Sequence, residues 1–366
     1  MRGDPGHESE ELLRRREGSL AMQGPAAAPI PWSDMSAAPA TRRLSLPELE
    51  ELCAAAVLSA GGSRETAAAL ARATCAAERR GRSAVGAAHL PDYLDGLCSG
   101  RIDGHAVPRL EHRRAAALAV DARGGIAQLA FEHALESFAD AARSCGVAVL
   151  SMHEAFSAGE LGHYAAQMAE QGLIGLACAN SPALMAVHGA REAVTGTNPL
   201  AFALPHPDGP RVMDQASSAT AWVRVRDAAR ADEQIPAGWA LDGTGEPTTD
   251  AEEALAGALL PFGGTKGANI ALMIEMLAAL SGGSFSLDAA PFDRGSRSPR
   301  LGLFVLAVDP EAFDPGYAGR LAEHLDRLRR EHAAGFGRPR PPITEVELPE
   351  DLYRMLRAAQ GQEQQR

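Results

Sequence analysis

The chain has 366 residues, of which 46% are hydrophobic and 22% are charged, so it is long enough for a large core and for two lobes in one folded unit. Its formal net charge is −12 without any long basic run, which argues against a nucleic-acid partner. No apolar run approaches the roughly 20 residues of a membrane span, so we expect no membrane partner. The five cysteines are scattered without CxxC or metal-ligand spacing, and they indicate reduced thiols in a cytoplasmic protein without a metal site.

Residues 1–44 mix charged residues with alanine, proline and glycine and show no helix or strand periodicity. They also lack the continuous apolar stretch of a signal peptide. We predict that this segment is a disordered tail or the product of a misassigned start, with Met22 or Met35 as the alternative first residue.

Residues 45–120 are predicted to form a helical N-terminal part. Ser45 and Glu48 have the spacing of a capping box at a helix start. A second helix is expected to stop at Gly81, and a third amphipathic segment covers about 90–97.

Short β-type runs begin near residue 117. The stretches "GVAVLSM" and "GLIGLACAN" are of this type, and Ala-rich helices separate them. This alternation predicts an α/β or α+β fold and leaves the sheet polarity open. Further on, residues 269–280 are apolar on nearly all sides, so we expect a buried helix there, followed by a late strand in "GLFVLAVDP" and a closing helix.

The usual nucleotide-binding motifs are missing from the sequence. It contains neither GxGxxG after a strand nor GxxxxGK[ST], so neither a Rossmann fold nor a P-loop is indicated. The stretch "FGGTKG" leads into the apolar helix and contains Lys266 and Gly267. A helix start with a lysine beside it can hold a phosphate, but a glycine-rich loop entering a buried helix has the same composition. Both interpretations stay open on the residues alone.

Several polar residues between apolar runs can each be interpreted in two ways, as part of a site or as a structural feature. Ser181 and Asn198 can bond the amide or hydroxyl groups of a ligand, or they can simply start turns. Asp214 follows a strand and precedes Ser217 and Ser218, where it is either a site residue or a helix cap.

The stretch "GRSAVGAAHLPDY" holds a single imidazole, His89, among small residues. By itself it is more typical of a partly buried histidine with its hydrogen bonds satisfied than of a catalytic acid.

Five motifs in a fixed order resemble the malate/L-lactate dehydrogenase-like oxidoreductases: "GELGHYAAQMAEQGLIGLACANSP", "GTNPLAFALP", "IPAGWALDGTGEPTTD", "ALLPFGGTKG" and "LFVLAVDP". This non-Rossmann family includes the Δ1-pyrroline-2-carboxylate and Δ1-piperideine-2-carboxylate reductases. The resemblance covers the chain from about residue 46 onward. It implies a largely antiparallel NAD(P)-binding domain, at residues 121–265, inserted in a helical domain to which residues 266–366 return. It also implies a homodimer with its active sites at or near the subunit interface.

The chain departs from the family pattern at three positions. Many members read Ser-His-Gly where this chain reads Ala84-Val85-Gly86, so the family's acid histidine falls on Val85. A family arginine falls on His89, and a second family histidine falls on Ser157. Oxidation of a 2-hydroxyacid needs a base for the hydroxyl proton and is poorly served by these changes. A protonated ketimine is already an electrophile, so its reduction asks mainly for orientation and one proton.

The resemblance therefore implies an NADPH- or NADH-dependent reductase that converts Δ1-pyrroline-2-carboxylate to L-proline, or the six-membered homologue to L-pipecolate. His89 would be the acid, because a histidine titrates near neutral pH, and Asp214 would stabilise the iminium charge or position His89. Arg82 and Ser83 are expected to bind the substrate. The resemblance places the cofactor against Ser157, Gly159, Ser181, Asn198, Ser217, Ser218, Lys266, Gly267, Arg338 and Arg340.

Two alternative functions stay open. The first is a 2-oxoacid reductase or 2-hydroxyacid dehydrogenase on the same scaffold. The second is an inactive relative that binds a nucleotide, which the loss of both family histidines would explain.

Overall fold

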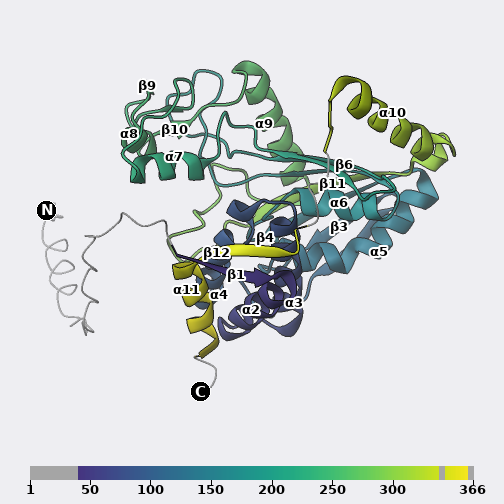
Figure 1. The fold of residues 1–366 in the computed structure, drawn as a ribbon, viewed down its shortest axis with the longest axis horizontal. Coiled ribbons are helices and arrows are strands. Elements are labelled where there is room, and N and C mark those ends of the chain that lie inside the picture. The colour runs from purple at the N-terminus through teal and green to yellow at the C-terminus, as the bar shows by residue number, and fades with distance from the viewer. Residues whose placement is uncertain (1–39, 338–342, 362–366) are drawn as a thin grey trace, which may run out of the picture. The chain divides into compact units, whose positions relative to one another are not determined.

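The computed structural model describes residues 40–337 and 343–361, and the two ends of the described chain meet in one helical part (Figure 1). Its elements are β1 (Thr41–Ser45), α2 (Leu46–Ser59), α3 (Arg64–Arg79), the 3-10 turns η1 (Ser83–Val85) and η2 (Ala87–His89), α4 (Leu90–Cys98), β12 (Glu345–Pro349) and α11 (Glu350–Gly361). Strands β1 and β12 pair antiparallel, and α11 packs on α2. The C-terminal residues therefore return to the helical part.

The predicted capping box at the start of α2 is confirmed. Ser45 Oγ accepts the Glu48 amide at 3.4 Å, and Glu48 Oε2 accepts the Ser45 amide at 2.8 Å. The prediction that residues 1–44 lack structure is wrong for 41–44, which belong to β1. The partner of β1 lies at residues 345–349, so no local sequence pattern signals this strand. Residues 1–39 lie outside the described part of the chain.

A seven-stranded sheet forms the second part, in the order β2-β3-β4-β11-β5-β6-β7. Its strands are β2 (Arg109–Arg114), β3 (Ala117–Asp121), β4 (Val147–Ala155), β5 (Ile174–Ala179), β6 (Leu200–Leu204), β7 (Arg211–Gln215) and β11 (Leu301–Val308). Strands β3 and β4 run parallel, whereas the other neighbouring pairs in this sheet are antiparallel. The predicted mixed fold with a largely antiparallel sheet is confirmed.

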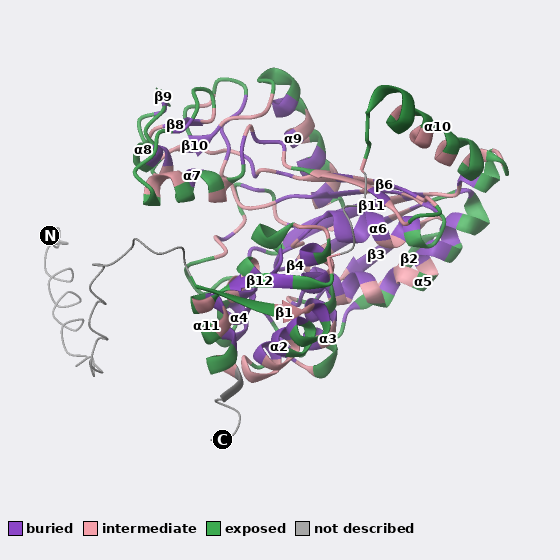
Figure 2. Cartoon of the chain, in the orientation of Figure 1, coloured by how far each residue is buried: buried purple, intermediate pink, exposed green. Residues whose placement is uncertain are grey.

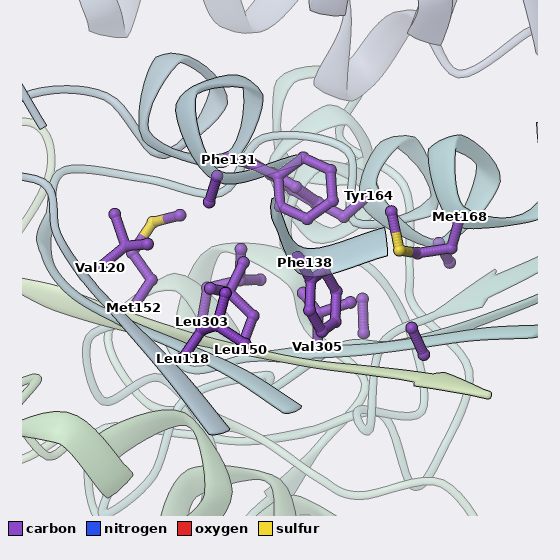
Figure 3. Close-up of a cluster of buried hydrophobic side chains, with 14 of the residues drawn as sticks. Leu118, Val120, Phe131, Phe138, Leu150, Met152, Tyr164, Met168, Leu303 and Val305 are labelled. Carbon is purple, nitrogen blue, oxygen red and sulfur yellow. The ribbon is translucent and has the colours of Figure 1, made fainter. Parts of the chain in front are cut away.

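Helices cover both faces of this sheet. On one face α5 (Ala127–Cys145) and α6 (Gly162–Glu170) bury a large apolar core that includes Phe131, Tyr164 and Val305 (Figure 3). On the other face α9 (Thr265–Ala278) packs on β5 and β11 through Ile274. The sheet is thus the rigid layer from whose strand ends the loops of the candidate site emerge.

The sheet extends beyond the range 121–265 on both sides. On the N-terminal side, β2 lies before residue 121 and β3 ends at it. On the C-terminal side, β11 comes from residues 301–308 but lies between β4 and β5 in the sheet. Pairing over this distance along the chain depends on tertiary packing, which local periodicity does not carry.

The remaining elements include a small lobe that packs around its own apolar cluster. The lobe comprises α7 (Trp222–Arg230), β8 (Ala240–Leu241), β9 (Pro247–Thr248), α8 (Ala251–Leu255) and β10 (Ala258–Leu259). The other remaining elements are η3 (Ala279–Ser281), η4 (Pro310–Ala312) and α10 (Tyr317–His332). Among the described helices, none combines the length and apolar character needed to cross a membrane.

The expectation of a buried helix over 269–280 is wrong for one side of it. Part of α9 is exposed (Figure 2). Met273 and Met276 are exposed by 50% and 56%, and Leu280 in η3 is exposed by 63%. The sequence is apolar on nearly all sides of the helix, but the sheet and the small lobe, which covers Ala268 and Ala271, leave one side exposed.

Gly302 on the central strand β11 gives a test of this packing. A Cβ at this position would collide with the carbonyl oxygen of Ala278 at the end of α9. We expect Gly302→Ala to lower the free energy of unfolding in urea by about 3 kcal/mol. As a control, Gly319→Ala in α10 meets nothing within 4 Å and should be neutral or slightly stabilising. Equal stability of both variants would contradict the close approach of α9 to β11.

Candidate active site

The loop that carries His89 is held by a buried carboxylate. Glu78, near the end of α3, is 3% exposed and accepts the Ser83 hydroxyl at 2.6 Å and the Ala87 amide at 2.8 Å. A Cβ at Gly86 would lie 2.6 Å from Glu78 Oε1, so a larger residue here would displace the carboxylate from its two donors. The two 3-10 turns are fixed in this way, and His89 stands at the end of the second.

The imidazole of His89 has a defined partner on each nitrogen. Nδ1 lies 2.7 Å from Asp92 Oδ2, and Nε2 lies 3.4 Å from Ser157 Oγ. Tyr93 and Phe292 meet the ring in edge-on contacts, with centroids at 5.1 and 6.5 Å. The ring is thus oriented on several sides, while 19% of the side chain remains exposed.

The segment after β4 brings Ser157 to His89. Ser157 is buried, and its Oγ accepts the Gly159 amide at 3.2 Å. Gly159 has φ +63, and a Cβ there would lie 2.9 Å from Gln128 Nε2, so the backbone conformation and the close side chain both favour glycine. Burial raises the pKa of Tyr93 to about 12, so its hydroxyl stays protonated and faces the Ser157 carbonyl at 3.3 Å.

Asp214, at the end of β7, meets the other end of the same segment. Its Oδ2 accepts the Gly162 amide at 2.7 Å, and its carbonyl oxygen accepts Arg82 Nη2 at 3.1 Å. Burial raises the pKa of Asp214 to about 6, and the nearby Glu160 carboxylate acts in the same direction. The Gly162 amide, Arg82 and Arg80 limit this rise. The residues between 157 and 162 therefore join the predicted acid to the predicted electrostatic partner and the predicted substrate arginine.

Arg80 and His163, near this segment, were not predicted from the sequence, whereas the family resemblance placed Glu160, within residues 157–161, against the nicotinamide or ribose. Arg80 binds the buried Glu160 with two bonds, Nε to Oε1 at 2.7 Å and Nη2 to Oε2 at 2.5 Å. Burial lowers the pKa of His163 to about 3, so its imidazole is neutral at ordinary pH. The only available signal was the family-like stretch "GELGHYAAQ", which contains Glu160 and His163 but does not reveal their partners.

A small pocket, wide enough for about one water molecule, lies among these residues. Its lining includes Val85, Gly86, Gln128, Gly159 and His163. The Oε1 atom of Gln128 is buried without a hydrogen-bond partner in the described part of the chain, so the pocket offers an unused acceptor.

Asn198 and Ser217 belong to a buried network. Asn198 Nδ2 donates to the carbonyl of Ala271 at 2.9 Å, and Asn198 Oδ1 accepts the Ser181 amide at 3.3 Å. Ser217 Oγ donates to the Asn198 carbonyl at 2.7 Å. Both side chains are fully buried and internally bonded, so they hold the loop backbone in place, and their direct contact with a cofactor stays a prediction.

The loop before α9 lies beside this network. The Phe262 amide donates to the Ser217 carbonyl at 3.0 Å, and Ser218 forms a bridge with Pro261. The side chain of Ser218 itself donates to the Thr220 carbonyl at 2.7 Å. The structure thus brings the 217–218 and 261–267 segments together, as a common cofactor site would require.

The start of α9 fits an anionic group. Gly263 and Gly264 have φ +57 and +61 and open space around their Cβ positions, and Lys266 is exposed. A Cβ at Gly267 would collide with the Phe262 carbonyl, so this glycine keeps the loop tight against the first turn. Amides at a helix start together with a lysine favour phosphate, and these residues therefore fit the diphosphate of a dinucleotide. The predicted contacts Arg338 and Arg340 lie outside the described residues.

Residues 44–362 match the malate/L-lactate dehydrogenase family. The protein therefore belongs to this family of oxidoreductases, and the predicted resemblance is confirmed.

Individual relatives narrow the comparison. The chain is 39% identical over 295 residues to the Δ1-pyrroline-2-carboxylate/Δ1-piperideine-2-carboxylate reductase of Pseudomonas putida, which covers 78% of this chain and 86% of the relative. It is 38% identical to the NADP+-dependent (2R)-3-sulfolactate dehydrogenase of Chromohalobacter salexigens, over 79% of this chain and 86% of that one. The crystal structure of the Δ1-piperideine-2-carboxylate reductase from Pseudomonas syringae pathovar tomato superposes with a TM-score of 0.76 at 36% identity and covers 87% of this chain and 94% of that chain.

The raised pKa of Asp214 predicts a pH-dependent effect on stability. The folded protein favours the neutral carboxyl, so ionisation costs stability as the pH rises from the ordinary value of 3.8 through about 6. Asp214→Asn keeps a neutral acceptor for the Gly162 amide. We expect it to raise the free energy of unfolding by about 2 kcal/mol near pH 8, because the partial exposure of Asp214 reduces the value that the shift alone would give. Near pH 4 this gain should shrink to about 0.5 kcal/mol. Urea denaturation at both pH values measures the difference, and an equal gain at the two would contradict it.

Proposed function

We propose that this protein reduces a cyclic ketimine carboxylate, Δ1-pyrroline-2-carboxylate to L-proline or Δ1-piperideine-2-carboxylate to L-pipecolate, with NADPH or NADH as the reductant. The observation that carries the proposal is the oriented His89, joined through residues 157–162 to Asp214 and Arg82. The similarity to the Pseudomonas reductases supports the substrate class.

Each of the three side chains has a role that follows from its charge. In the reduction the imine carbon gains a hydride, and the ring nitrogen carries a proton. His89 donates this proton to the ring nitrogen, or keeps it on the nitrogen if the imine is already protonated. When ionised, the carboxylate of Asp214 stabilises positive charge on the ring nitrogen. Arg82 is exposed beside Asp214, and its guanidinium binds the substrate carboxylate.

The cofactor would be held by the start of α9, with Lys266 and the Gly263–Gly264 turn against the diphosphate. Ser181 would add a contact from the loop after β5. Its Oγ accepts the Thr197 amide at 3.2 Å, which orders this loop. When bound, the nicotinamide supplies the hydride. The side chains around His89 would exclude bulk water from one side of the substrate ring, because Tyr93 and Phe156 are buried there.

A second candidate function is the reduction of a 2-oxoacid on the same scaffold. The similarity to a sulfolactate dehydrogenase favours it. Turnover of pyruvate at a higher kcat/KM than that of the imine would identify this function instead.

The central test compares NADPH and NADH oxidation by the purified protein with Δ1-pyrroline-2-carboxylate and with pyruvate. We expect imine turnover in the wild type and a loss of about 10²- to 10⁴-fold in kcat for His89→Ala, as for removal of a general acid. Cofactor binding, followed by nicotinamide fluorescence, should be unchanged. The control His112→Ala alters an exposed histidine on β2 and should keep full activity. Turnover that survives in His89→Ala would contradict the role of this imidazole.

We further propose that the protein is a cytoplasmic homodimer. The exposed apolar side of α9 supports an interface, because Met273, Met276 and Leu280 follow the spacing of one helix face. All five cysteines are free thiols, as expected in a reducing compartment.

The mass of the protein in solution tests the proposed dimer interface on α9 directly. A glutamate on an apolar contact surface must be desolvated, so Met276→Glu should convert the dimer to a monomer when measured by light scattering. Val107→Glu is the control, because Val107 is also exposed, by 68%, and lies outside α9. A wild type that is already monomeric, or a dimer that persists in Met276→Glu, would contradict this interface.

A further inference from the structure

The candidate site contains a further charged residue, Asp92, beside His89. It lies in the first turn of α4, three residues after His89, and its Oδ2 is 2.7 Å from His89 Nδ1. An ionised carboxylate only accepts hydrogen bonds, so a contact of this length places a proton on Nδ1. On the opposite side of the ring, Nε2 lies 3.4 Å from Ser157 Oγ.

The charge of Asp92 is secured by its surroundings. Burial raises the pKa of Asp92, but the hydrogen bond from His89 and the positive charges of His89, Arg226 and Arg101 outweigh it, so the pKa is lowered. Arg101 is nearly buried and is paired with Asp95 one turn further along α4. Asp92 is therefore an anion at every pH at which the enzyme would work, and it remains an acceptor for Nδ1.

The partner of Nε2, the Ser157 hydroxyl, can donate a hydrogen bond to it. Ser157 Oγ already accepts the Gly159 amide at 3.2 Å, and its own hydrogen is available to point at Nε2. A neutral His89 with its proton on Nδ1 has an unshared pair on Nε2, directed at this hydroxyl. When His89 is protonated, the second proton is on Nε2, on the side where residues 157–162 connect to Asp214 and Arg82.

We propose that Asp92 is a positioning residue that fixes the neutral tautomer of His89 with the proton on Nδ1, so that Nε2 is the atom that takes up and gives the catalytic proton. This inference rests on the proposed function, because it concerns the acid of that reaction. In an aqueous histidine neither nitrogen is held by a carboxylate, and the orientation of the ring is not fixed. The carboxylate of Asp92 fixes both the protonated nitrogen and the orientation of the ring, as does the buried aspartate beside a catalytic histidine in other enzymes.

Asp92 also stands where an acidic residue favours a helix start. A purely structural role of this kind would lower stability and leave the tautomer of His89 and kcat unchanged. The two roles are therefore separable by measurement. Glu65 offers a control, since it is an exposed acidic residue in the first turn of another helix, α3.

The experiment combines kinetics with the state of the imidazole. For Asp92→Asn we expect kcat on Δ1-pyrroline-2-carboxylate to fall by about 10- to 100-fold while KM changes less than about twofold, because an amide can hold the wrong tautomer. Asp92→Glu should recover part of kcat, and Glu65→Gln should leave it unchanged. In 15N spectra of histidine-labelled protein, with His89 assigned from the missing signals of His89→Asn, the neutral wild-type ring should carry its proton on Nδ1. In Asp92→Asn a population with the proton on Nε2 should appear.

Two results would overturn the inference while the proposed function stands. They are a wild-type His89 with its neutral proton on Nε2, and an Asp92→Asn variant that keeps the wild-type kcat. A wild type that is folded and binds NADPH but does not turn over the imine would overturn the proposed function itself, and this inference with it.

Discussion

The carboxylate of Glu78 is the group on which the geometry of the candidate site depends. It is buried, and neutral donors from Ser83 and Ala87 satisfy it. A buried charge without such partners is costly, so the 83–87 loop has one favoured arrangement in which both donors reach the carboxylate. Gly86 permits the close approach. The loop then sets Arg82 before it and His89 after it.

The sheet supplies the other half of the site. The segment that follows β4 places Ser157 against His89, and its far end places the Gly162 amide against Asp214 on β7. Strands β4 and β7 belong to one rigid sheet. The imidazole of His89, from the helical part, and the carboxylate of Asp214, from the sheet, are therefore held at fixed positions relative to each other. The arrangement suits a reaction that needs one proton and one stabilising charge, more than one that needs a strong base.

Much of the local structure could be predicted from the sequence, because its signals are local. The capping box of α2 and the alternation of helices and strands are examples. The central place of β11, the pairing of β1 with β12 and the exposed side of α9 depend on distant partners and left no local pattern. Composition also could not separate Asn198, which is bonded inside the protein, from residues free to meet a ligand. The contact of Asp92 with His89 likewise left no local pattern, since it depends on the 3-10 turn before α4.

A crystal structure of the protein with NADP+ and L-proline would test the account most directly. It would show which side chain meets the nitrogen that the reaction protonates. The account predicts His89 Nε2 within hydrogen-bond distance of the proline nitrogen, at about 3 Å, with Arg82 at the carboxylate. A proline nitrogen that faces solvent, or a product ring bound away from the 157–162 segment with His89 still closed on Asp92 and Ser157, would contradict it.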